Sequence, residues 1–154
     1  AGIKKTYRAL LVGRWHGGKR ELKHRLQTFR GPGQIKRSEV SSEGREAHSI
    51  FDPVTQFFEH TLMDVEIKTG RLHQVRVHAQ AIGLPVAGDR IYGTADANRH
   101  IRKFGLTRQF LHADRLVFQH PIEKRQLDIH APLPNELDSV LGQLQTQLTD
   151  SRSS

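Results

Sequence analysis

Alternating apolar and polar residues predict strands along much of the chain. Residues 5–12 alternate, with Tyr7, Ala9 and Leu11 on one side and Arg8 on the other. Residues 57–67 alternate in the same way and predict a long, half-buried strand. Shorter strands are predicted around residues 35–40, 48–51, 110–112, 116–120 and 127–131. A turn at residues 41–44 separates the first two of them.

Two segments have helical spacing. Leu72, Val75, Ala79 and Ile82 share one helical face before Gly83, so residues 71–82 are expected to form a helix. A second helix is expected behind Asn135, a favourable N-cap, because apolar residues recur at helical spacing at Leu137, Val140, Leu141, Leu144 and Leu148. Residues 150–154 are expected to be a disordered tail.

The remaining segments are polar. Residues 16–37 contain several glycines and many cations, and they predict a loop or an irregular ribbon. Residues 88–93 also predict a loop, and residues 94–105 show no clear element. Since the strands follow one another with few helices between them, we expect an α+β fold with a mixed or antiparallel sheet.

Length and charge narrow the class of protein. The 154 residues suit one domain, and 24 Lys and Arg against 16 Asp and Glu give a net charge of +8. Residues 1–45 hold 12 of these cations and 3 of the acids. Such asymmetry favours nucleic acid as a partner, although a solvated surface explains a charge run equally well. The chain has no Cys, which excludes disulfides, and shows no membrane span, so a cytoplasmic protein is expected.

The segment Lys68-Thr-Gly-Arg-Leu-His-Gln-Val-Arg-Val-His78 gathers cations around a Thr-Gly bend, at the predicted strand-to-helix junction. A helix N-terminus beside Lys68, Arg71 and His73 favours an anion, and Arg76 lies on the same helix. A surface helix with solvated Arg and His residues is an equally good interpretation. His73 and His78 are five residues apart, whereas zinc-binding helices use a spacing of four, so a metal site is not expected.

The residues 68–78, followed by Gly83-Leu-Pro-Val-Ala-Gly-Asp-Arg-Ile-Tyr-Gly93, resemble the RluA-type pseudouridine synthases, and most closely the members that modify large-subunit ribosomal RNA. Further similar segments are Lys5-Thr-Tyr-Arg-Ala-Leu-Leu-Val-Gly13, Leu111-His-Ala113 and Leu116-Val-Phe-Gln-His-Pro121. They occur in the family's order. The resemblance implies a mainly antiparallel sheet flanked by helices and loops.

The resemblance also implies an isomerisation without cofactor or metal, in which the N1 glycosidic bond of a uridine in RNA breaks and C5 is joined to the ribose. The target base would first flip out of the RNA. Tyr7 resembles the active-site Tyr that stacks on the uracil. Arg76 resembles the Arg that pairs with the catalytic Asp, while Lys68, Arg71, His73 and Gln74 would support the pocket or bind the RNA backbone.

The nucleophile of this family is an Asp in a run reading His-Arg-Leu-Asp, and no such run occurs here. The family's order places it before the segment that contains Tyr7. We therefore expect residues 1–149 to be the C-terminal part of a catalytic domain whose sheet is incomplete on the N-terminal side, with the missing N-terminal part as a partner and no turnover by this chain alone. The alternative is an RNA-binding module or remnant without catalysis.

Overall fold

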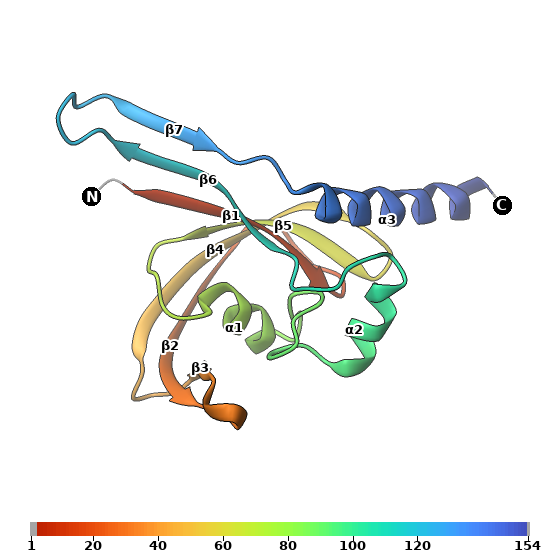
Figure 1. Ribbon diagram of the computed structural model, residues 1–154, viewed down its shortest axis with the longest axis horizontal. Coiled ribbons are helices and arrows are strands. Elements are labelled where there is room, and N and C mark those ends of the chain that lie inside the picture. Colours follow the sequence, from red (N-terminus) through yellow and green to blue (C-terminus); the bar gives the residue numbers. More distant parts are fainter. Residues whose placement is uncertain (1–2, 154) are drawn as a thin grey trace.

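The computed structural model describes residues 3–153, which form one seven-stranded antiparallel sheet with helices on both faces (Figure 1). The strands lie in the order β3-β2-β4-β5-β1-β6-β7. Their bounds are β1 Lys4–Val12, β2 Arg20–Arg30, β3 Lys36–Val40, β4 Arg45–Gln56, β5 His60–Ile67, β6 Leu111–Gln119 and β7 Gln126–His130. The helices are α1 Gln74–Ala81, α2 Ala95–Arg102 and α3 Asn135–Ser153, with a short 3-10 turn, η1, at Pro32–Gln34. The predicted α+β class and mainly antiparallel sheet are confirmed.

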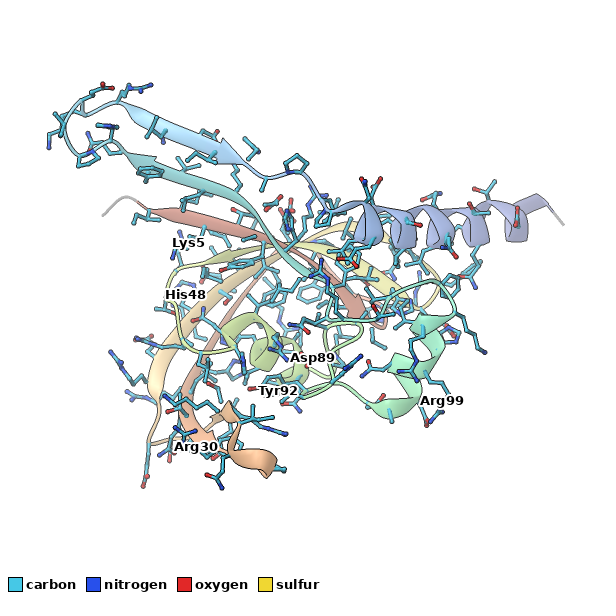
Figure 2. All side chains as sticks on the ribbon, viewed as in Figure 1. Lys5, Arg30, His48, Asp89, Tyr92 and Arg99 are labelled. Atoms are coloured by element: carbon cyan, nitrogen blue, oxygen red, sulfur yellow. The ribbon has the colours of Figure 1, made fainter. Side chains whose placement is uncertain are left out.

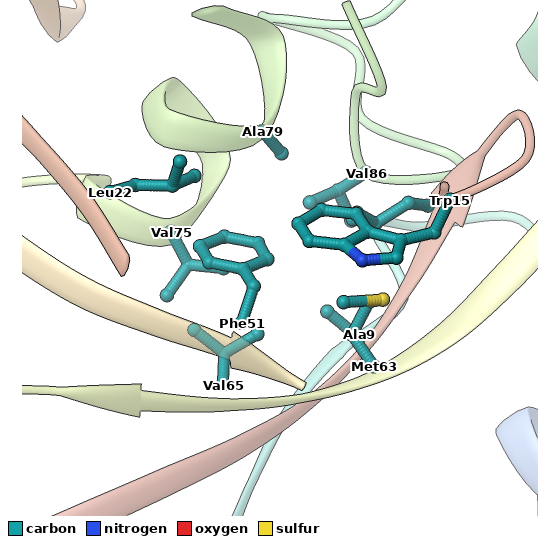
Figure 3. Close-up of a cluster of buried hydrophobic side chains, with 10 residues drawn as sticks. Ala9, Trp15, Leu22, Phe51, Met63, Val65, Val75, Ala79 and Val86 are labelled. Carbon is teal, nitrogen blue, oxygen red and sulfur yellow. The ribbon is translucent and has the colours of Figure 1, made fainter. Parts of the chain in front are cut away.

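The alternation in β1 and β5 creates two separate cores. Ala9 and Leu11 face α1, where they pack with Phe51, Met63 and Val75 (Figure 3). Leu10, between them in sequence, faces the opposite side and packs against residues of α2 and α3. Since a strand turns successive side chains to opposite faces, three consecutive buried residues require cover on both sides of the sheet.

Helix α1 begins at Gln74, three residues later than predicted. His73 has a φ of 54°, in the left-handed region, and is therefore the residue before the helix rather than part of it. The polar segment without a predicted element contains α2, whose first turn is capped by the Thr94 hydroxyl accepting a hydrogen bond from Ala97 N.

The prediction of a loop or an irregular ribbon over residues 16–37 is wrong, because a regular eleven-residue strand, β2, lies within it. Leu22 and Leu26 are buried on its inner face, and His24 lies between them on that face, while most neighbouring polar residues are exposed. The period-two pattern is present, but the cations and the flanking glycines concealed it. The hydrogen bonds of β2 come from β3 and β4 on its two sides.

At the opposite end of the sheet, β6 and β7 form a hairpin that projects from the rest of the fold (Figure 1). Strand β6 carries a bulge where it pairs with β1: Thr6 opposes Arg115 and Tyr7 opposes Ala113, so that Asp114 has no opposite residue. The expected helix after Asn135 is α3. It continues to Ser153 through most of the predicted tail, and Ser154 lies outside the described residues.

Candidate active site

The bend at residues 68–71 is held by the side chain of Gln74, the first residue of α1. Gln74 is 4% exposed. Its Oε1 accepts hydrogen bonds from the Thr69 hydroxyl at 2.7 Å and from Arg71 N at 3.0 Å. Its Nε2 donates to His48 O at 3.0 Å and to Ser49 Oγ at 2.8 Å. Both N–H donors and both acceptor positions of the amide are used, so Gln74 links the bend to β4 and has no group left for a ligand.

The two cations of the bend lie at the surface. Lys68 Nζ is 2.8 Å from Glu66 Oε2. Arg71 Nε donates to Glu46 O at 2.8 Å, and the residue lines a polar pocket of about 310 Å³ together with Arg45 and Ser38. The lining of this pocket includes Arg71 but neither Lys68 nor His73, so the residues of the predicted anion site do not share it.

Arg76 is directed into the interior on the other side of α1. Its Nε donates to Asp89 Oδ2 and its Nη2 to Asp89 Oδ1, both at 2.8 Å, and the two side chains are 9% and 0% exposed. Oδ1 of Asp89 also accepts hydrogen bonds from Ile91 N and Tyr92 N, each at 3.0 Å. Burial raises the pKa of Asp89, but the hydrogen bonds from Arg76 and Tyr92 outweigh it and hold the pKa below its usual value. Asp89 is therefore ionised at neutral pH.

Tyr92 completes this buried centre (Figure 2). The Arg76 guanidinium carbon lies 5.2 Å from the centroid of the Tyr92 ring, and the Tyr92 hydroxyl is 2.7 Å from His73 Nδ1. Burial and the nearby Arg76 lower the pKa of His73, so its ring is neutral at pH 7. Asp89 and Tyr92 had no predicted role, although both belong to the segment 83–93. Their role could have been inferred only from chemistry, because a buried Arg requires an anionic partner.

Tyr7 lies elsewhere, on β1 between Val65 of β5 and Ala113 of β6. It packs partly against the core beneath α1 and also lines a mainly apolar pocket of about 260 Å³ with Leu116 and Ile129. Asp114, displaced by the bulge, lines the same pocket. Burial, and then the nearby Asp64, raise the pKa of Asp114.

The predicted site residues therefore divide into three groups. Lys68, Arg71 and Gln74 form the bend, Arg76 and His73 meet at Asp89 and Tyr92, and Tyr7 lines the pocket at the bulge. The first two groups are joined through α1. Among residues 3–153, the polar partners of Arg76 are in the segment 89–92, and the Tyr7 hydroxyl is not one of them.

Around β2, β3 and the start of β4 lies a basic hairpin region, which consists of the exposed residues Arg20, Lys23, Arg25, Arg30, Lys36 and Arg45. Within the described part of the chain, none of the six lies within 4.0 Å of a carboxylate oxygen. Other cations are paired, for example Arg8 with Asp64 at 2.5 Å. The same three strands also carry Glu21, Glu39 and Glu46, so the cations of this region outnumber the acids without being ion-paired to them.

Over residues 3–153, no three side chains of His, Cys, Asp or Glu are grouped so that they could hold a metal ion. No helix in the same range has both the length and the apolar composition needed to cross a bilayer.

The fold is that of pseudouridylate synthase domains. It is similar to the solved structure of human RNA pseudouridylate synthase domain containing 1, with a TM-score of 0.70 at 22% identity over 93% of this chain and 66% of that one. The structure of human RNA pseudouridylate synthase domain containing 4 is also similar, with a TM-score of 0.71 at 19% identity over 93% of this chain and 62% of that one.

The sequence agrees with the fold. The family model described as RNA pseudouridylate synthase matches residues 1–81, and this chain belongs to that family. Ribosomal large subunit pseudouridine synthase C of Vibrio cholerae is 33% identical over 92% of this chain and 44% of the relative. An uncharacterized RNA pseudouridine synthase of Chloroflexus aurantiacus is 37% identical over 93% of this chain and 43% of the relative. The chain thus spans less than half the length of these relatives.

Proposed function

We propose that this chain forms part of an RNA pseudouridine synthase that isomerises specific uridines of large-subunit (23S) ribosomal RNA to pseudouridine, in the cytoplasm. The observation that carries the proposal is the family match over residues 1–81, which includes both Tyr7 on β1 and Arg76 on α1. The relatives named as large-subunit ribosomal enzymes support the choice of RNA.

In this proposal, Tyr7 stacks on the flipped uracil in the pocket that it shares with Leu116 and Ile129. That pocket has the features expected of a base site, since it is mainly apolar and its aromatic residue is half-buried rather than enclosed. The N1–C1′ bond breaks and a C5–C1′ bond forms. C5 then loses its proton and N1 gains one, so the product is an isomer of uridine.

Arg76 holds the nucleophilic carboxylate. Asp89 takes Nε and Nη2, and among residues 3–153 the remaining nitrogen, Nη1, has no hydrogen-bond acceptor. A guanidinium fixed on one side by a bidentate pair presents its third nitrogen in a defined direction. A second carboxylate at Nη1 would be kept ionised and oriented. We propose that this carboxylate is an Asp encoded upstream of Ala1, in a missing N-terminal part of the same protein.

The basic hairpin region and the pocket beside the bend bind the RNA backbone. Six exposed cations without carboxylate partners suit repeated phosphate contacts, and Lys68 and Arg71 extend the same charge toward the bend. Replacing Arg30 and Lys36 together with Gln should weaken RNA binding and lower the slope of log K against log salt by up to about 2.

The decisive experiment measures pseudouridine in ribosomal RNA incubated with the protein as its gene encodes it, including any sequence upstream of Ala1. We expect the encoded protein to form pseudouridine and residues 1–154 alone to form none. Tyr7→Ala should remove turnover. Asp96→Asn, at an exposed position on α2 outside that pocket, is the control and should retain it, whereas turnover by residues 1–154 alone would show that the nucleophile lies within this chain.

A non-catalytic RNA-binding module is the second candidate, and the unpaired cations of the basic hairpin region favour it. It predicts tight RNA binding with a steep salt dependence and no pseudouridine, even when the protein carries everything its gene encodes. The two candidates therefore differ in a single measurement on the same sample.

A further inference from the structure

The hydroxyl of Tyr92 connects three separate parts of the fold. The Tyr92 side chain lies in the loop between α1 and α2 and is 6% exposed overall. Its oxygen accepts a hydrogen bond from Ser38 N of β3 at 2.9 Å and lies 2.7 Å from Nδ1 of His73, the residue before α1. A phenylalanine would fill the same volume, so packing alone does not account for the hydroxyl.

The first of these contacts satisfies a buried backbone N–H group of the edge strand, that of Ser38. Strand β3 is at the edge of the sheet, where backbone N–H groups lack a neighbouring strand. The Ser38 N–H is buried and is satisfied by the Tyr92 oxygen instead, while the Ser38 hydroxyl donates to Leu72 O at 2.7 Å. The edge of the sheet is therefore joined both to the Tyr92 loop and to the residue that precedes His73.

The second contact determines the orientation of His73. In the tautomer with the imidazole hydrogen on Nε2, the Tyr92 hydroxyl donates its hydrogen to His73 Nδ1 while its oxygen accepts from Ser38 N. The two rings meet edge to face, with centroids 5.4 Å apart. His73 has a left-handed backbone conformation that non-glycine residues rarely adopt, so an interaction that fixes its side chain also fixes the start of α1.

The third connection runs to the Arg76–Asp89 pair. Tyr92 N donates to Asp89 Oδ1, and the Tyr92 ring lies under the Arg76 guanidinium. One residue thus contacts the cation through its ring, the carboxylate through its backbone, and α1 and β3 through its hydroxyl. A rotation of the ring would alter the plane against which the guanidinium rests.

We propose that Tyr92 is a positioning residue for the isomerisation: its hydroxyl, held between Ser38 and His73, sets the plane of the ring that aims Arg76. This inference rests on the proposed function and adds a residue that touches neither RNA nor the reacting atoms. It predicts that the hydroxyl contributes to the rate of the chemical step and not to RNA affinity.

The test is Tyr92→Phe in the protein as encoded, which removes the hydroxyl and keeps the ring. We expect pseudouridine formation at saturating RNA to slow about tenfold, with the dissociation constant for RNA changed less than about twofold, because small misplacements of an oriented group lower the rate without affecting binding. His73→Asn, which tolerates the left-handed conformation, should slow the reaction similarly, and the double variant should be no slower than either single one.

Thr94→Ala is the matched control. It deletes one hydrogen bond two residues away, at the N-cap of α2, and touches neither Arg76 nor Asp89. A rate for Tyr92→Phe within twofold of the original protein, or a loss equal to that of Thr94→Ala, would overturn the proposal. The Nε–H NMR signal of Arg76 gives a readout independent of activity, and it should move in Tyr92→Phe and not in Thr94→Ala. If the original protein forms no pseudouridine, the proposed function fails, while an unmoved signal refutes the positioning role separately.

Discussion

Replacing Arg76 with Met, which has a similar volume, should destabilise the fold as well as the chemistry. The substitution leaves Asp89 buried, with 0% of its side chain exposed, and removes the cation that pairs with it. Oδ2 loses its hydrogen bond from Nε and Oδ1 loses the one from Nη2, while Oδ1 keeps the donors Ile91 N and Tyr92 N. Breaking a buried ion pair by removal of one partner costs about 3–5 kcal/mol, which is a large share of a typical stability of about 5–15 kcal/mol.

Urea unfolding of the original protein, Arg76→Met, Asp89→Asn and the double variant measures this cost. The double variant should be less destabilised than the sum of the single ones, by about 1–3 kcal/mol, because no uncompensated charge remains. Arg76→Lys should lie between the original protein and Arg76→Met, since an ammonium keeps the charge but loses the bidentate geometry.

The cost should also depend on pH. In Arg76→Met, burial without the guanidinium places the folded-state pKa of Asp89 above its unfolded value. The deficit is therefore full at neutral pH and shrinks as the pH falls toward the unfolded pKa, where Asp89 becomes protonated in the variant. A loss below about 1 kcal/mol at pH 7, or additive single effects, would refute the assignment of Arg76 and Asp89 as one buried unit. Turnover by Arg76 variants is informative only where the protein remains folded.

Two further predictions concern stability. Burial lowers the pKa of both His60 and His78 to about 4, and His24 contributes at His78. The folding stability should therefore be full above pH 6.5 and should fall by up to about 3 kcal/mol for each His as the pH drops from 6.5 toward 4. His78→Gln should flatten this pH profile, measured by urea unfolding. Gly88→Ala should lower the free energy of unfolding by about 2–4 kcal/mol, because Gly88 has a φ of +79° and a Cβ would lie 2.2 Å from Arg108 O. At Gly70 a Cβ would meet no atom within 4 Å, so Gly70→Ala should change it by less than about 0.5 kcal/mol. Thermal unfolding measures both, and equal effects at the two glycines would contradict this explanation.

The strands with regular alternation could be located from the sequence, but the charged ones could not. β1 and β5 lie where expected because one side of each alternation is buried under α1. β2 was missed because its cations are tolerated by solvent on its outer side, and its register is set by β3 and β4. The start of α1 was misplaced by three residues, since the left-handed His73 depends on contacts with Tyr92.

The candidate site shows the same limit. The family resemblance identified Tyr7 and Arg76 as site residues. In the structure Tyr7 lines the pocket at the bulge, and Arg76 is buried against Asp89. Gln74, expected near a ligand or as support, has all of its strong hydrogen-bonding capacity used within the bend. Asp89 and Tyr92 entered only with the structure, because nothing in their spacing shows which of the many cations they face.

By itself, the sequence determined the class of fold, the family and the two faces of the central strands. These follow from local periodicity and from runs of residues that are contiguous in the chain. Only the tertiary structure decided that Arg76 pairs with Asp89, 13 residues away, and that Tyr92 satisfies the edge strand at Ser38, 54 residues away. Burial makes such polar contacts obligatory, but the reversal of the chain across the sheet selects the partners.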